Sequence, residues 1–158
     1  MNLSTDTIDV LKNFSNINQN ILVKPGKTVQ TISTMKNILA EAEIKEEFGS
    51  EFAIYDLPEF LRSIELFDSP SLNFNGGHNV TINEEKSKQN IKYFFADKSV
   101  IVAPTKTITM PDKFVSFAFK KESFAKLMKA ATTLNLVDVA VVGNGSKIHM
   151  VATDKKNK

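Results

Sequence analysis

The sequence predicts an α+β fold in which helices gather on one face of antiparallel sheets. The main observation is a unit of helix, strand, glycine-containing turn and strand, which the chain repeats three times. The second observation is strand-like alternation, clearest in FVSFAFK, where Val115, Phe117 and Phe119 share one face. The units begin about 55 to 65 residues apart, a spacing that is typical of structural repeats.

The first unit begins with a helix over about residues 4–18, which leads into a strand at NILV. The turn Lys24-Pro25-Gly26-Lys27 then predicts a hairpin with a returning strand at TVQTIS, because glycine supplies the positive φ of tight turns. Two further strands are predicted at ILAEAEI and EFAIYD.

The second unit begins with a helix over Pro58 to Phe67, with Asp56 placed to cap it and Pro58 suited to its first turn. The strands SLNF and NVTIN follow, joined by a turn at residues 75–78, and NIKYFFAD, SVIVAP and FVSFAFK read as further strands. The third unit has a helix over Glu122 to Leu134 and the strands VDVAVV and KIHMVAT, joined by a turn at residues 143–146.

Two prolines and three threonines interrupt the strand pattern in APTKTITMPD. We therefore predict a first domain at residues 1–102 with two units, a connector at 103–112, and a second domain at 113–158 with one unit. A second domain built like the first would need another unit, so we expect this one to be partial, with KIHMVAT as an unprotected edge strand.

Composition excludes several classes of protein. The 158 residues contain no cysteine, which excludes disulfides, thiolate nucleophiles and cysteine metal sites. No apolar run approaches the roughly 20 residues needed to span a bilayer, and the N-terminus lacks the pattern of a secretory signal. The net charge of +2 is small, so any basic surface must come from segregation of charge.

Residues of catalytic or metal-binding type do not form a recognisable site. His78 and His149 fall at or beside different hairpins, where no local spacing supplies carboxylate partners for a metal. The acidic pairs are interpreted as solvated loop residues: Glu46 with Glu47, and Glu84 with Glu85. No phosphate-binding glycine motif occurs. We expect no enzymatic activity, no metal and no cofactor.

Helical periodicity gives each predicted helix an apolar side: Leu3, Val10, Leu11, Phe14 and Ile17 in the first, Leu57, Phe60, Leu61, Ile64 and Phe67 in the second, and Phe124, Leu127, Met128, Ala131 and Leu134 in the third. Each helix carries at least one cation opposite this side. These are Lys12 on the first helix, Arg62 on the second, and Lys126 and Lys129 on the third. A polar outer face is ordinary for a surface helix and explains any one of them. The alternative is a set of helices that present cations to a phosphate backbone, with weak and salt-dependent binding to any sequence.

Four segments in order, LSTDTIDVLKNFSNIN, AIYDLPEFLRSIELF, VIVAP and KKESFAKLMKAATTLNLVDVAVV, resemble the DNA sliding clamps of T-even-type bacteriophages, the polymerase processivity factors. The resemblance implies the DNA clamp fold, with helices on one face of curved antiparallel sheets. It also implies a ring of three subunits whose helices line a hole for duplex DNA, in the cytoplasm of the infected bacterial host. Such a clamp tethers the phage DNA polymerase, supports late transcription together with late-transcription factors, and is opened by an ATP-dependent clamp loader.

Carried onto this sequence, the resemblance assigns DNA-facing roles to Lys12, Arg62, Lys126 and Lys129, with Lys120 and Lys121 as further candidates. It places a partner-peptide region near the connector, at Ile44, Ala103, Ile108 and Met110. For Ile108 and Met110 the alternative is a connector that packs onto its own sheet.

Clamps of this type have four such helices per subunit, whereas this sequence predicts three. We therefore expect a C-terminally incomplete clamp: a gene fragment, one part of a split gene, or an incomplete sequence, which forms a homotrimer if the rest is supplied. The alternative function is a truncated module that binds polymerase or clamp-loader peptides without forming a ring.

Overall fold

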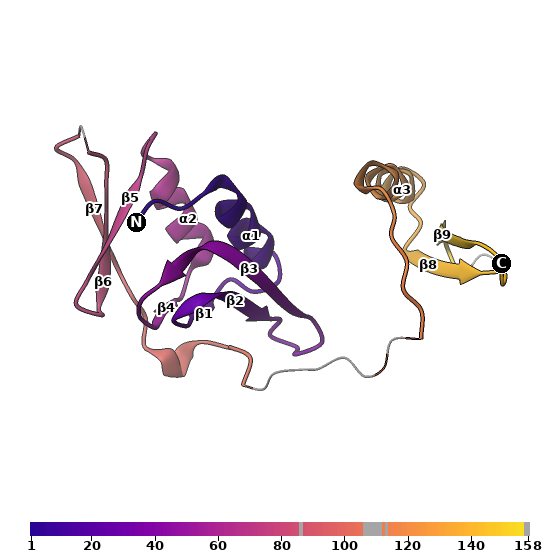
Figure 1. The fold of residues 1–158 in the computed structure, drawn as a ribbon, viewed down its shortest axis with the longest axis horizontal. Coiled ribbons are helices and arrows are strands. Elements are labelled where there is room, and N and C mark those ends of the chain that lie inside the picture. The colour runs from indigo at the N-terminus through magenta and orange to yellow at the C-terminus, as the bar shows by residue number, and fades with distance from the viewer. Residues whose placement is uncertain (86, 106–111, 113, 157–158) are drawn as a thin grey trace. The chain divides into compact units, whose positions relative to one another are not determined.

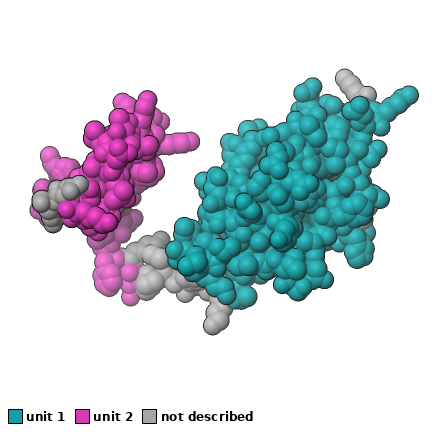
Figure 2. Space-filling view, turned by 180° about the vertical axis from the view of Figure 1, so that it is seen from behind, with its two compact units in different colours: residues 1–107 teal, residues 108–158 magenta. Residues whose placement is uncertain are grey.

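The computed structural model describes residues 1–85, 87–105, 112 and 114–156. Helices and antiparallel strands make up the fold, which confirms the predicted α+β class. The chain divides into two compact units (Figure 2). The first unit, Met1–Thr107, contains the first two predicted repeats, and the second unit, Ile108–Lys158, contains the third. Most of the predicted connector at 103–112 lies outside the described residues, and so do Ile108 and Met110. None of the described helices is both long enough and apolar enough to cross a membrane.

Two helices of the first unit begin at side-chain caps. Helix α1 (Thr5–Ser15) starts after Ser4, whose Oγ accepts from the Thr7 amide at 3.3 Å. Helix α2 (Leu57–Glu65) starts after Asp56, whose Oδ1 accepts from the Glu59 amide at 2.7 Å, with Pro58 in the first turn. The predicted cap and first turn of α2 are confirmed, because local sequence determines such features.

The N-terminal strands pair differently from the predicted hairpin. Strand β1 (Ile21–Val23) pairs with β4 (Phe52–Ile54), and β2 (Gly26–Ile32) pairs with β3 (Leu39–Phe48), all antiparallel. The prediction that NILV and TVQTIS form a hairpin is therefore wrong. Pro25 has no N–H to donate to a ladder, and Gly26 at φ +114° redirects the chain. β1, whose first and last residues are buried, instead forms its hydrogen bonds with the fully buried β4.

The second hairpin forms as predicted. Strands β5 (Ser71–Asn75), β6 (Asn79–Asn83) and β7 (Asn90–Phe94) make one antiparallel sheet, with Gly76 and Gly77 at positive φ in the tight turn between β5 and β6. Beyond β7, the Phe95 amide donates to the carbonyl of His78 at 2.9 Å, and the Ala96 amide donates to the carbonyl of Ala53 on β4 at 2.9 Å. The first bond extends the pairing of β6 with β7, and the second joins this sheet to β4.

Two predicted strands are absent. The first two residues of SVIVAP instead lie in the 3-10 helix η1 (Lys98–Val100), which Asp97 caps by accepting from the Ser99 amide at 2.8 Å. Residues 114–120, predicted as the strand FVSFAFK, form no strand. The ring of Phe119 instead contacts Phe124 of the following helix, with centroids 5.4 Å apart. Alternation alone did not provide a partner strand, which a ladder requires.

The core of the first unit lies between its two helices and its strands. Helices α1 and α2 lie side by side, and β3 packs against α1 (Figure 1). The aromatic rings pack in contact with one another, Phe52 against Phe48, Phe74 and Phe95 at 4.8 to 5.2 Å between centroids. Four of the five side chains predicted to face the core from this helix are buried in α2, whereas Phe67 follows the helix and is partly buried. The four are Leu57, Phe60, Leu61 and Ile64.

A buried asparagine ties the end of this unit to its sheet. Asn18 is 4% exposed, and its Nδ2 donates to the carbonyls of Ile32 (2.8 Å) and Val102 (3.2 Å). The Val102 amide donates to Oδ1 of Asn20 at 3.0 Å. The segment that leaves η1 is therefore fixed by side chains that follow α1.

The second unit contains helix α3 (Lys121–Thr133) and the hairpin of β8 (Asp138–Gly143) and β9 (Ile148–Thr153), with α3 packed against β9. The predicted hairpin is confirmed, and Gly145 takes φ +89° in its turn. The predicted core face of α3 is mostly exposed, however. Ala131 is the one buried residue of α3, while Phe124 and Leu134 are 37% and 66% exposed.

Candidate nucleic-acid interface

Lys12 lies on the exposed side of α1 and is paired. Its Nζ lies 2.6 Å from Oε1 of Glu65, the last residue of α2, and both side chains are 50% exposed. The hydrogen bond from Lys12 to Glu65, together with the charge of that carboxylate, raises the pKa of Lys12. The charge of Lys12 is therefore already paired with a carboxylate of the same chain.

Arg62 lies on the exposed face of α2, opposite the buried residues of the helix. The ion pairs that form in the described part of the chain are Lys12–Glu65, Lys45–Asp6 and Lys98–Glu51. Arg62 takes part in none of these pairs. Its planar guanidinium is available to a phosphate, for which its donor geometry is well suited.

The charged residues of α1 and α2 are more acidic than basic. Acids outnumber cations four to two in these helices: Asp6, Asp9, Glu59 and Glu65 against Lys12 and Arg62. A phosphate backbone near this surface would meet repulsion as well as attraction.

Helix α3 has the opposite balance. Lys121, Lys126 and Lys129 face a single acid, Glu122, and all are exposed. Lys120 is the N-cap residue and makes no side-chain capping hydrogen bond. Cations at a helix N-terminus oppose the helix dipole, so Lys120 and Lys121 are poorly placed to stabilise the helix. Their placement fits an external anion better than a role in helix stability.

The predicted partner-peptide residues that the structure describes, Ile44 and Ala103, lie in different surroundings. Ile44 lies on β3 in the hydrophobic core and is only 6% exposed, which leaves its side chain little surface for a partner. Ala103 lines a small pocket with Pro104 and with residues of β1, β2 and the segment between them: Leu22, Lys24, Thr28 and Gln30. The described start of the connector therefore lies against these strands.

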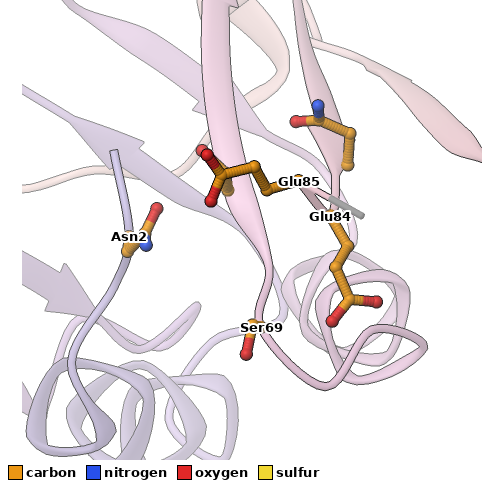
Figure 3. A pocket seen from close by; sticks show the side chains of 6 residues that line it. Asn2, Ser69, Glu84 and Glu85 are labelled. Atoms are coloured by element: carbon orange, nitrogen blue, oxygen red, sulfur yellow. The ribbon is translucent and has the colours of Figure 1, made fainter. Parts of the chain in front are cut away.

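A polar cavity of about 570 Å³ lies beside the β5–β6–β7 sheet. Its lining residues are polar or acidic: Asn2, Ser69, Ser71, Asn83, Glu84 and Glu85. The carboxylates of Glu84 and Glu85 point in different directions (Figure 3). Acid–base catalysis requires groups that converge on a substrate, and these two do not.

The second unit has an apolar cavity of about 540 Å³ between α3 and β9. Aromatic and aliphatic side chains line much of it, with polar residues among them: Phe117, Ala118, Phe119, Ser123, Phe124, Lys126, Leu127, Ile148, His149 and Met150.

The two histidines belong to different units. His78 lies in the first unit, in the turn between β5 and β6, and His149 lies in the second unit, on β9. The part of the chain that the structure describes holds no group of three or more possible metal ligands.

Sequence reasoning missed the role of one glutamate. Glu46 and Glu47 lie on β3, so the prediction that they belong to a solvated loop is wrong. A carboxylate oxygen of Glu46 accepts from the amide of Ser4, and the other accepts from Oγ1 of Thr7. This side chain therefore fixes the start of α1 to the sheet. No local sequence motif predicts these hydrogen bonds, because Thr7 and Ser4 lie 39 and 42 residues from Glu46 in the sequence.

Comparison with known proteins gives consistent results. The sequence model of a family described as DNA polymerase processivity factor matches residues 4–103. A sliding clamp of Vibrio phage KVP40 is 34% identical over 98% of this chain and 71% of its own length. The sliding clamps of Escherichia phage RB69 and Enterobacteria phage T4 are 34% and 32% identical, each over 94% of this chain and 64% of their own length. The chain thus spans 64 to 71% of the length of these curated relatives.

Proposed function

This chain belongs to the family of DNA polymerase processivity factors, and from that premise we propose that it is a sliding clamp subunit. In this role it encircles duplex DNA as part of a ring and tethers a phage DNA polymerase to its template. The observation that carries the proposal is the identity of 34% with a sliding clamp across 98% of this chain. Further partners of the proposed ring are two more subunits, an ATP-dependent clamp loader and late-transcription factors, in the host cytoplasm.

The exposed cations support this role through chemistry that is independent of DNA sequence. Arg62, Lys126 and Lys129 are exposed and pair with no acid in the described part of the chain. Side chains of this type bind phosphates through charge, so that binding weakens as salt rises. A ring is retained by topology, and each contact therefore needs to contribute only modestly. In this proposal the chain binds and positions other molecules and catalyses no reaction.

Charge reversal tests the proposed DNA contacts. Arg62→Glu and Lys126→Glu are expected to reduce stimulation of the phage polymerase on primed DNA, because each places a carboxylate where a phosphate would lie. Lys27→Glu is the matched control, since Lys27 is an exposed lysine on β2 rather than on a helix. Circular dichroism should show all three variants folded. Equal stimulation by all three variants and the unmodified protein would refute the assignment.

A non-ring module that binds peptides of the polymerase or the clamp loader is the second candidate. The exposed apolar side chains around the cavity of the second unit favour it, since such a surface is suited to an apolar peptide. Native mass spectrometry separates the candidates. A trimer supports the ring, whereas a monomer that is not retained on circular DNA supports the module.

A further inference from the structure

The ion pair of Lys12 and Glu65 connects the exposed sides of two neighbouring helices. Helices α1 and α2 lie side by side (Figure 1). The pair bridges them with 2.6 Å between Nζ and Oε1. Both side chains are half exposed, so water and solutes reach them. A phosphate that approached Lys12 would find the position of its anion already occupied by a carboxylate.

Glu65 also neighbours the second proposed cation of this unit. It follows Arg62 by three residues on α2, a spacing that places two side chains next to each other on a helix surface. Both residues are exposed. One carboxylate is therefore placed to weaken the attraction of DNA to Lys12 directly and to Arg62 through its charge.

Stability gives a poor explanation for this glutamate. Glu65 is the last residue of α2, and a negative charge at a helix C-terminus opposes the helix dipole. Exposed ion pairs contribute little to folding, because water screens them and the side chains lose freedom. The pair is better explained by what it does to ligands of Lys12.

We propose that Glu65 competes with DNA phosphates for Lys12 and thereby keeps the affinity of the first unit for DNA low. This inference rests on the proposed function. A phosphate can pair with Lys12 only by displacing Glu65, so the net free energy of binding from this contact is small. A weak hold suits a protein that must move along DNA while topology prevents its escape.

A double-mutant cycle tests the competition. Binding of a labelled random-sequence duplex is measured by fluorescence anisotropy over a series of salt concentrations, with the unmodified protein, Glu65→Gln, Lys12→Gln and the double variant. We expect Glu65→Gln to bind about threefold more tightly, in line with the strength of exposed ion pairs. The slope of log affinity against log salt should become steeper by about 0.9, as one more phosphate is neutralised. In the Lys12→Gln background, both changes should largely disappear.

The control is Glu59→Gln, which removes the same charge from the first turn of α2, where Glu59 pairs with no lysine in the described part of the chain. An equal gain with Glu59→Gln, or a full gain without Lys12, would overturn the inference in favour of a general charge effect. Thermal unfolding confirms that each variant is folded.

Arg62→Gln separates this inference from the function on which it rests. If Arg62→Gln weakens DNA binding but Glu65→Gln does not tighten it, the competitor role alone is overturned. If Arg62→Gln and Lys12→Gln both leave DNA binding unchanged, this unit makes no helix-face contact with DNA, and the proposed contacts and the role of Glu65 are both wrong.

Discussion

The two units of the molecule use the same elements but bury them to different extents. In the first unit, α1 and α2 both contribute buried apolar residues to one hydrophobic core. In the second unit, as far as the structure describes it, α3 packs against β9 and Phe124 stays 37% exposed. The difference shows that α3 and the β8–β9 hairpin do not cover each other fully. A repeated unit of this kind needs a neighbour to complete its core.

The charges differ in the opposite sense. The well-packed helices α1 and α2 carry more acids than cations, whereas the poorly buried α3 carries three lysines and one acid. In the proposed function, the attraction to DNA is therefore strongest on the helix that contributes least to a core. Packing is thus strongest in α1 and α2 and the excess of cations is largest in α3, so the two properties can be tested separately.

The largest effect should come from removing one aromatic side chain from each unit. Phe60→Ala, at a site that is 2% exposed, should lower the free energy of unfolding by about 4 kcal/mol, because it leaves a cavity. Phe124→Ala should cost less than about 1 kcal/mol, since its ring is already partly in water. Urea unfolding followed by circular dichroism measures both. Equal losses would mean that the second unit is as well packed as the first.

The next effect acts on the polar tie that holds α1 in the first unit. Burial raises the pKa of Glu46, but hydrogen bonds from Thr7 and Ser4 outweigh it, and the net pKa is below the usual 4.5. The stabilisation is therefore complete above pH 4.5 and is lost as the pH falls through the lowered value. Glu46→Gln should cost about 1.5 kcal/mol at pH 7.

The unfolding free energy of Glu46→Gln should also fall less on acidification than that of the unmodified protein. Its control is Glu47→Gln, the next residue on β3, which is exposed. Measuring unfolding from pH 7 to pH 3 compares the three proteins. Identical pH profiles for Glu46→Gln and the unmodified protein would contradict the account of this tie.

The smallest effect concerns the helix caps. Asp56→Ala should destabilise the first unit by about 1 kcal/mol, because the Glu59 amide loses its acceptor. Lys120→Asp should have the opposite sign and stabilise α3 by about 0.5 kcal/mol, since it supplies a cap and removes an unfavourable N-terminal cation. Thermal unfolding of both variants checks the signs. A loss of stability in both would show that α3 does not lack a cap in solution.

Local features of the fold could be predicted from the sequence, whereas pairings between distant residues could not. The cap at Asp56, the core face of α2 and the hairpins around Gly76 and Gly145 depend on neighbouring residues, and all were predicted. The pairing of Ile21 with Ile54 depends on which strand is nearest in space, so a hairpin was wrongly predicted there. FVSFAFK alternates like a strand but forms none, because alternation specifies a face and no partner.

The same distinction applies to the candidate site. Helical periodicity predicted that Lys12, Arg62, Lys126 and Lys129 would lie on polar faces, and all four are exposed. It could not predict that Lys12 pairs with Glu65, because that contact joins two helices far apart in the sequence. Contact of these cations with DNA stays a prediction.

Retention on circular DNA tests the central proposal most directly. The chain is loaded with its clamp loader and ATP onto nicked circular DNA, the complex is isolated by gel filtration in high salt, and the circle is then cut once. A sliding clamp should remain with the intact circle and dissociate from the linear product. Equal loss from the circle and the linear DNA, or equal retention on both, would contradict the account.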